Sequence, residues 1–317
     1  MNKDLFVAVT FDTDSDIFEG ADVASNPFSP LPWKGISDGI PLLYEHTHSI
    51  VDSYGSPLIF TWLVRADNQI KRIHDSSTFL LEEYNHIWKF AIHRGDEIGW
   101  HPHLYKLDDN LWVQETCDAT NTRILMSTFE DLKKIDTLPI SARVGETYCS
   151  NAIIDTFEKL GVMCDSSAMP GRSRKFKGGG VSWINAPSRP YTPSYTDYSK
   201  PCSQSRSILE VPLSMVPIKA PYDEDFYQRY VDLTFYHKFL ENGLKKLVKE
   251  SDLIVTISHP NTLLKRKLLR HGLLSFDIKE FIKNLNVIIS ECNKNGRNFR
   301  FISLKNCCHL FKNYVNS

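Results

Sequence analysis

The sequence lacks an excess of charge of either sign. Its 37 lysine and arginine residues are balanced by 38 aspartate and glutamate residues, and the formal net charge is −1. Proteins that bind nucleic acids broadly need a basic surface that neutralises the phosphate backbone. We therefore expect no nucleic-acid partner, although this balance is compatible with a local basic patch.

Long apolar runs and targeting signals are also missing. No stretch of about 18 uninterrupted apolar residues occurs, so we expect no transmembrane helix. The first apolar stretch is short and ends at Asp12, unlike a signal peptide, which favours a cytoplasmic location. The seven cysteines include no Cys-x-x-Cys pair, so neither a disulfide framework nor a zinc finger is indicated, and reduced thiols are expected.

Apolar segments typical of strands alternate with longer amphipathic segments. Strands are predicted over residues 5–11, 57–63, 97–101, 142–144, 162–165, 208–213, 253–258 and 299–304. Helices are predicted over residues 38–53, 151–160, 226–249 and 277–294. This alternation indicates a parallel α/β architecture, and about eight strands in 317 residues favour a single barrel domain, 1–317, over an open sheet.

One long irregular segment, residues 170–201, interrupts the alternation. It is rich in glycine, proline and tyrosine and includes the triplet Gly178-Gly179-Gly180. Loops of this length inside a compact domain are usually functional. We predict an inserted loop that covers the mouth of an active site, rather than a linker.

Two stretches carry a local excess of basic residues. The first, residues 171–177, begins the inserted loop, and its cations suit a phosphate or a uronate, with a solvated loop as the alternative. The second, residues 263–270, is rich in leucine. It is predicted as an ordinary amphipathic helix, with contact to an anionic membrane as the alternative.

Two aspartates follow the first predicted strand. Asp12 and Asp14 lie at positions i and i+2 of an extended segment, so both carboxylates face the same side. Carboxylates this close repel each other unless they share a cation or a proton. A metal ligand beside a general base is one solution. The Asp-x-Asp pair also opens phosphotransferases with an aspartate nucleophile, and a solvated acidic turn is the third interpretation.

Two histidines follow the third predicted strand. Pro102 excludes a helix interior, so His101 and His103 project together from an extended segment. Neutral imidazoles are the commonest metal ligands, and catalytic zinc takes three protein ligands and a water. The two histidines and one carboxylate of the first motif would supply that set, while surface histidines are the alternative.

Arg143 and His259 stand at the ends of two further predicted strands. A buried arginine can hold a carboxylate in one orientation, although an ordinary surface ion pair is the alternative. A histidine has an ordinary pKa near 6.5 and can act as a general acid at neutral pH. The alternative is a loop histidine whose hydrogen bonds are satisfied and that has no catalytic role. In a barrel the carboxyl ends of the strands form one face, where active sites lie. We therefore expect these side chains to meet the aspartates and histidines.

In this order, the motifs resemble those of the polysaccharide deacetylase family, the NodB-homology fold of carbohydrate esterases. The matching segments are the paired aspartates (10–14), the approach to the histidines (95–101), the arginine strand (143–146), the Asp-Ser-Ser turn with its Pro-Gly (165–171) and the closing His-Pro (259–260). The His-x-His motif and the proline- and tyrosine-rich segment 186–194 are most similar to the WbmS-like branch. That branch is associated with bacterial surface polysaccharides, including the O-antigen of lipopolysaccharide.

The resemblance implies a distorted (β/α) barrel of the NodB-homology type with an inserted lid loop at 170–201. It implies a metal-dependent hydrolase of a carbon–nitrogen bond other than a peptide bond. The substrate would be an N-acylated amino sugar, nucleotide- or lipid-linked, that loses an acetyl or formyl group. A catalytically inactive sugar-binding or assembly protein of the same fold, and an aspartate-nucleophile phosphatase, are the alternatives.

The resemblance also assigns roles by position. The metal, expected to be Zn²⁺, would be bound by Asp14, His101 and His103; the base would be Asp12, steadied by Arg143; and the acid would be His259. The two aspartates could exchange these roles.

Residues outside the motifs would bind the substrate. A backbone N–H near Tyr148 would help to hold the oxyanion, and the basic side chains of the inserted loop would bind a charged part of the substrate. These side chains are Arg172, Arg174 and Lys175.

Overall fold

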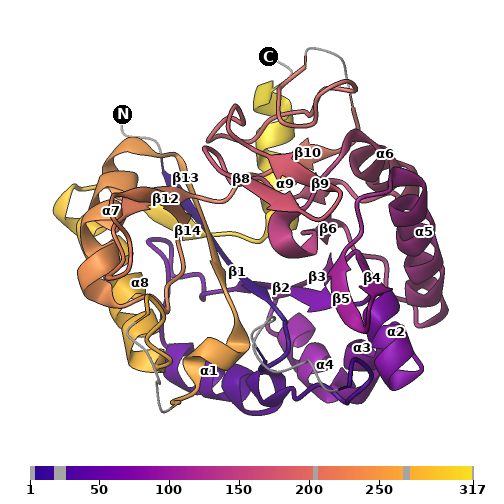
Figure 1. Cartoon of the computed structure of the whole chain (residues 1–317). Coiled ribbons are helices and arrows are strands. Elements are labelled where there is room, and N and C mark those ends of the chain that lie inside the picture. The colour runs from indigo at the N-terminus through magenta and orange to yellow at the C-terminus, as the bar shows by residue number, and fades with distance from the viewer. Residues whose placement is uncertain (1–3, 18–25, 203–205, 267–271, 316–317) are drawn as a thin grey trace.

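Eight parallel strands form the central sheet of the computed structural model, which describes residues 4–17, 26–202, 206–266 and 272–315. The strands are β1 (Leu5–Asp12), β2 (Phe60–Arg65), β3 (Glu97–His101), β6 (Ser141–Ala142), β7 (Cys164–Asp165), β10 (Leu209–Glu210), β13 (Leu253–Ser258) and β14 (Phe299–Phe301). Their order is β10–β7–β6–β3–β2–β1–β13, and β14 pairs with the start of β1. The sheet curls into an open, distorted barrel, as predicted (Figure 1).

Helices pack on both faces of this sheet, with most of them on its outside and the last one against the opposite face. They are α1 (Ile40–Thr47), α2 (Asn68–His74), α3 (Phe79–Glu83), α4 (Asn85–His93), α5 (Asp118–Lys134), α6 (Asn151–Leu160), α7 (His237–Glu250), α8 (Ile278–Lys294) and α9 (Leu304–Val315). Short helical turns are η2 (Gly35–Gly39), η3 (Gly145–Thr147) and η4 (Pro260–Leu263). In Figure 1, α5 and α6 flank one side of the barrel and α7 and α8 the other.

Three two-stranded hairpins stand outside the central sheet. They are β4–β5 (Tyr105–Asp108 with Leu111–Gln114), β8–β9 (Ser173–Phe176 with Gly179–Ser182) and β11–β12 (Met215–Ile218 with Tyr227–Tyr230). None of the three was predicted, because each strand is only four residues long, and β8, β9 and β12 are largely exposed.

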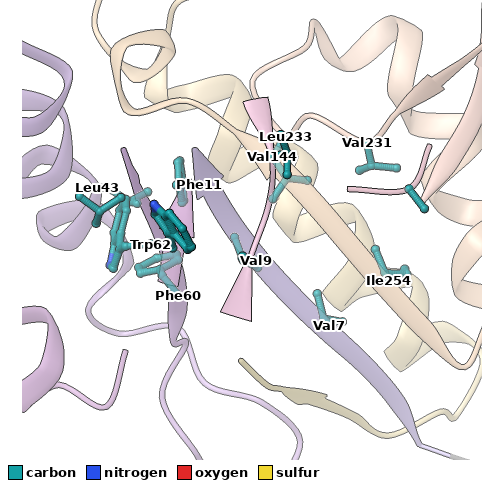
Figure 2. Close-up of a cluster of buried hydrophobic side chains, with 14 of the residues drawn as sticks. Val7, Val9, Phe11, Leu43, Phe60, Trp62, Val144, Val231, Leu233 and Ile254 are labelled. Carbon is teal, nitrogen blue, oxygen red and sulfur yellow. The ribbon is translucent and has the colours of Figure 1, made fainter. Parts of the chain in front are cut away.

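Alternate side chains of β1 enter two apolar clusters, one on each face of the sheet. Val7, Val9 and Phe11 belong to the larger cluster, whereas Ala8 belongs to a smaller one that includes residues of α9. In the larger cluster, Phe11 stacks on Trp62 with ring centroids 4.8 Å apart (Figure 2). Burial of both faces explains why the central strands are continuous apolar runs in the sequence.

The start and end of α6 follow from its capping residues. The Ser150 hydroxyl accepts a hydrogen bond from the backbone N–H of Ile153, and Gly161 ends the helix with a φ of 85°. A serine at the first position and a glycine in the left-handed region at the last are common helix signals. The predicted helix over 151–160 is therefore confirmed in type and bounds.

The prediction of one helix over residues 226–249 is wrong in its first half. Tyr227–Tyr230 form strand β12, and α7 begins only at His237. The strand pairs antiparallel with β11, and Val231 and Leu233 then enter the core as alternate residues of an extended segment. The buried residues of this segment therefore repeat every two positions, as in a strand, and not with the spacing of a helix. The helix predicted over 38–53 is shorter too, because α1 ends at Thr47.

The inserted segment 170–201 begins with the β8–β9 hairpin and continues as turns. The hairpin contacts the body of the protein through two ion pairs. Lys177 Nζ lies 2.8 Å from Oδ2 of Asp108, the last residue of β4, and Arg174 Nη1 contacts Glu146 Oε2 in η3. Its role as a lid stays a prediction, and so does the single-domain organisation.

The second basic stretch is described only in part. Its first residue ends η4, and residues 267–271 lie outside the described residues. Among the residues that the structure describes, no helix combines the length and apolar character needed to cross a bilayer.

Candidate metal centre

The carboxyl ends of five parallel strands meet at one end of the barrel and bring polar side chains together. Asp12 ends β1, Arg65 ends β2 and His101 ends β3, while Arg143 and His259 directly follow β6 and β13. The backbone partner of Arg65 in the ladder is His101. The parallel direction of the strands therefore gathers residues that lie far apart in the chain.

Three side chains at this end of the barrel converge on one point. Asp14, His101 and His103 each offer a ligand atom, and these atoms lie within 4.8 Å of one another. His103 Nε2 lies 2.9 Å from Asp14 Oδ1 and 3.1 Å from His101 Nε2, and His101 Nε2 lies 3.6 Å from the same oxygen. Two nitrogens and one oxygen facing each other are a donor set that suits zinc.

The orientation of His101 is fixed from behind by a backbone carbonyl. His101 Nδ1 lies 2.7 Å from Arg143 O, and a carbonyl oxygen can only accept, so Nδ1 is the donor. In the neutral imidazole, Nε2 then carries the lone pair and points at Asp14. A carbonyl in this position is the usual outer partner of a metal-bound histidine.

Gly145 leaves the space that the His103 ring occupies. A Cβ atom added at Gly145 would overlap that ring, so any other residue would displace the imidazole. The backbone N–H of His103 donates to Asp67 Oδ2 at 3.1 Å, which fixes the chain on its other side. Asp67 thus fixes the backbone of His103, and Gly145 leaves just the space that its ring needs.

Asp12 is bound by a fully buried arginine. Arg143 Nη1 lies 2.7 Å from Asp12 Oδ1, and neither side chain is more than 4% exposed. The guanidinium is itself fixed by Ser166, whose carbonyl accepts from Nε at 2.7 Å and whose hydroxyl accepts from Nη2 at 2.9 Å. The second oxygen of Asp12, Oδ2, lies 3.8 Å from His101 Nε2, on the side of the ligand cluster.

His259 closes the other side of the cluster. Its Nε2 lies 3.4 Å from Asp14 Oδ2, and the side chains of His259 and Asp14 are 19% and 26% exposed. Those of His101, His103 and Asp12 are at most 4% exposed. A substrate would therefore reach the cluster past Asp14 and His259.

Charges within the cluster shift the pKa values of Asp14 and His101. Burial alone would raise the pKa of Asp14, but the charges and hydrogen bonds of His103 and His101 hold it well below its usual range. Burial alone would lower the pKa of His101, but Asp12 and Asp14 outweigh it and raise that pKa. The same negative field attracts a divalent cation.

Asp232 lies behind His259 as a buried carboxylate. Its Oδ1 accepts from the hydroxyl of Ser258 at 2.8 Å and from the backbone N–H of Thr234 at 2.8 Å. Burial raises the pKa of Asp232. Burial lowers the pKa of His259, but Asp14, Asp12 and Asp232 outweigh it and raise that pKa to about 9.

We expect the imidazole of His259 in the metal-free protein to titrate near pH 9. An unfolded histidine titrates near 6.5, so this group adds stability that is complete below pH 6.5 and is lost as the pH rises toward 9. The Asp232→Asn variant removes one of the negative charges and should lower the midpoint. The test is a ¹³C-resolved NMR titration, with the His259→Gln spectrum to assign the signal. An ordinary midpoint, or one that Asp232→Asn leaves in place, would contradict this prediction.

Two further residues near the motifs have different surroundings. Asp16 does not join the cluster, because its carboxylate accepts the backbone N–H groups of Lys34 and Gly35. A backbone N–H near Tyr148 was predicted as an oxyanion donor, and that of Tyr148 itself donates to Gly145 O at 3.2 Å. Tyr148 is 4% exposed, and an oxyanion donor near Tyr148 stays a prediction.

The basic side chains of the inserted loop lie on β8 and just before it. Arg172 Nη1 donates to Gln228 O at 3.1 Å, Arg174 pairs with Glu146, and Lys175 is exposed. Only the pair of Arg174 leads back to the cluster. Glu146 accepts from the Tyr105 hydroxyl at 3.2 Å, and the Tyr105 ring packs on His103 with centroids 4.9 Å apart.

Three residues of the site were not predicted: Arg65, Asp67 and Asp232. The strand prediction that ends at residue 63 stops two residues before Arg65, which is the true end of β2. Asp232 fell inside the wrongly predicted helix. An arginine directly after an apolar run, followed two residues later by an aspartate, was the available signal.

Comparison with known proteins supports the fold. No protein-family model matches the chain, and no curated protein matches it either. Among solved structures, a protein from Mycobacterium smegmatis classed as a polysaccharide deacetylase is similar, with a TM-score of 0.54 and 13% identity over 100% of this chain and 93% of that one. This likeness shows a shared fold, so the architecture implied by the resemblance is confirmed.

Two further solved structures are similar at lower scores. WbmS from Bordetella bronchiseptica, classed as a polysaccharide deacetylase involved in O-antigen biosynthesis, has a TM-score of 0.40 and 14% identity over 90% of each chain. A family 4 carbohydrate esterase from Streptomyces lividans, in complex with acetate, has a TM-score of 0.39 and 7% identity over 96% of this chain and 95% of that one.

Proposed function

We propose that the chain is a metal-dependent hydrolase that removes an N-acyl group, acetyl or formyl, from an amino sugar. The observation that carries this proposal is the convergence of Asp14, His101 and His103 between an arginine-bound aspartate and a third histidine, His259. Each of these groups has a separate chemical use in hydrolysis of an amide.

The donor set fits a catalytic divalent metal, with Zn²⁺ as the expected ion. Three protein ligands with a partly exposed side are typical of catalytic zinc, which keeps one position open. When bound, the ion would polarise the acyl carbonyl and lower the pKa of a water molecule. Asp14 is the better ligand of the two aspartates, because its Oδ1 faces both imidazoles while Asp12 is bound to Arg143.

Asp12 is suited to the role of general base. Arg143 holds its Oδ1, so the carboxylate cannot rotate, and Oδ2 stays directed toward the ligand cluster. A water molecule attacking the acyl carbon loses its proton to that oxygen. The arginine also offsets the cost of burying the charge of Asp12.

His259 is suited to the role of general acid. In the metal-free protein, burial lowers the pKa of His259, but Asp14, Asp12 and Asp232 outweigh it and raise that pKa to about 9, and Asp232 is a counter-charge for the protonated imidazole that does not bind the metal. As the carbon–nitrogen bond breaks, the proton passes from His259 to the nitrogen, and the sugar leaves as an amine instead of an anion. In each reaction Asp12 gains one proton and His259 loses one. Proton exchange with solvent then returns both residues to their starting states.

The sugar and its carrier enter the proposal through the inserted segment. Arg174 pairs with Glu146 at the wall of the cluster, so a phosphate or uronate of a nucleotide- or lipid-linked sugar could replace Glu146 on that guanidinium. Arg172 and Lys175 add positive charge beside it. Such substrates fit the biosynthesis of bacterial surface polysaccharides, which we include in the proposal.

The phosphatase alternative explains less of the site. An aspartate nucleophile would need a free carboxylate, whereas both oxygens of Asp12 are directed by Arg143 and the ligand cluster. It also leaves the facing imidazoles without a use. Paired imidazoles favour zinc, while phosphatases of that type favour magnesium on oxygen ligands.

The test is hydrolysis of N-acetylated and N-formylated sugar nucleotides by the zinc-loaded protein. We expect release of acetate or formate together with an equal amount of free amine, and none from the Asp12→Asn variant. Release of phosphate from sugar phosphates would instead support the phosphatase. Binding of the sugar nucleotides without turnover would show the inactive alternative.

A further inference from the structure

A second buried arginine stands at the ligand cluster. Arg65 is the last residue of β2 and is 1% exposed, which makes it one of the largest fully buried side chains of the protein. It is the residue of β2 that faces His101 in the ladder. The mechanism proposed above does not use it.

The guanidinium of Arg65 is held in one place by its neighbours. Nε donates to Asp67 Oδ2 at 2.9 Å, and Nη2 donates to Gln69 Oε1. Nη1 lies 3.7 Å from Asp14 Oδ1, the oxygen that faces the two imidazoles. The backbone N–H donates to the hydroxyl of Thr13, the residue before Asp14, at 2.9 Å. Both ends of this arginine therefore contact the segment that carries Asp14.

Asp67 joins the same unit to a second ligand. Its Oδ2 accepts from Arg65 Nε and also from the backbone N–H of His103 at 3.1 Å. Its Oδ1 accepts from two backbone N–H groups in the first turn of α2, those of Gln69 and Ile70, at 2.9 Å each. Four donors surround this fully buried carboxylate, so it cannot move without losing one of them.

Arg65 and Asp67 therefore contact two of the three candidate ligands. Arg65 lies against the carboxylate of Asp14, and Asp67 holds the backbone of His103. Outer partners of this kind orient metal ligands, and their loss typically costs about 10- to 100-fold in metal affinity. Arg65 also gives Asp14 a counter-charge, as Arg143 does for Asp12, so each of the two neighbouring aspartates has its own arginine.

We propose that Arg65 is a positioning residue of the metal centre that sets the affinity for the divalent cation. It fixes Asp14 directly and His103 through Asp67. The inference rests on the metal centre of the proposed function, but not on the identity of the sugar or the acyl group.

Charge and geometry act in opposite directions at this position, which makes the inference testable. A positive charge beside Asp14 repels a dication, so a purely electrostatic role predicts tighter metal binding when the charge is removed. A positioning role predicts weaker binding when the fork is lost. Lysine keeps the charge but cannot contact Asp67 and Gln69 together while facing Asp14. The Arg65→Lys variant therefore isolates the geometric contribution.

The experiment measures the zinc dissociation constant of the metal-free full-length protein by competition with a chromophoric chelator. We expect Arg65→Lys to weaken zinc binding by about 10- to 100-fold. The matched control is Arg206→Lys, because Arg206 is 4% exposed and pairs with Asp155 and Glu158 on α6. Zinc affinity in this control should match the wild type. Urea unfolding establishes that each variant is folded.

A second variant covers the case in which Arg65→Lys does not fold. Gln69→Met removes one anchor of the guanidinium without burying an unpaired charge, and it should weaken zinc binding in the same direction. Wild-type zinc affinity in the folded variants would overturn the inference while leaving the metal centre in place. A wild-type protein that binds no zinc would overturn both the metal centre and this inference.

Discussion

The His101→Ala protein is expected to retain almost no zinc and to lose deacylation. His101 presents Nε2 to Asp14 and His103, and its other ring nitrogen is bonded to Arg143 O. Alanine removes one of three ligands and leaves the other two without a third donor. Since the loss of an outer partner alone costs about 10- to 100-fold in metal affinity, we expect a loss of more than about 100-fold here. Metal content after dialysis and acetate release from an N-acetylated sugar nucleotide measure the two effects.

A second histidine provides the matched control. His237 begins α7 and contacts Glu241 and Asn284. The His237→Ala protein should keep both its zinc and its activity, although its stability can fall slightly. If His101→Ala kept full metal content and full activity, the proposed metal centre would be wrong.

The Arg143→Met protein is expected to lose activity and much of its stability while it still binds zinc. The side chain of Arg143 is fully buried and pairs with Asp12, which is 3% exposed. Removal of the cation leaves a buried carboxylate without a partner, which costs about 3–5 kcal/mol of the free energy of unfolding. Without the arginine Asp12 can also rotate, so Oδ2 is no longer held toward the ligand cluster. Urea unfolding at pH 7 and initial rates measure the two losses.

The double variant Asp12→Asn/Arg143→Met separates stability from activity. It replaces both charges, and a buried ion pair that is removed as a whole is often close to neutral in stability. We therefore expect the free energy of unfolding to recover most of the loss while deacylation stays absent. Stability as low as that of Arg143→Met alone would show that Ser166, and not Asp12, is the important partner of the arginine.

The central sheet could be predicted because its strands are buried on both faces. Each of the eight predicted strands corresponds to a strand of that sheet, within a few residues of its observed bounds. Burial of both faces demands continuous apolar side chains, and this pattern does not depend on the rest of the fold. Placing chemical groups at the carboxyl ends of these strands then led to Asp12, His101, Arg143 and His259.

The rest could not be predicted, because it depends on contacts between distant segments. Asp232 precedes α7 in an extended segment that only pairing with the core distinguishes from a helix. Arg65 and Asp67 contact Asp14 and His103 through side chains, and a single sequence has no pattern that reveals such contacts. The hairpin β8–β9 lies within a segment in which glycine and proline indicated only a loop.

The two contacts of Arg143 have a consequence for how this centre could change by mutation. Its backbone carbonyl orients the imidazole of His101, whereas its side chain holds Asp12. A substitution at this position removes the side-chain contacts with Asp12 and Ser166 but keeps the contact with His101, because every residue keeps the carbonyl. A single substitution could thus convert the proposed enzyme into a protein that still binds its metal ion and its substrate but does not hydrolyse the substrate. Loss of catalysis and loss of ion binding would then be separate events in the descent of such proteins.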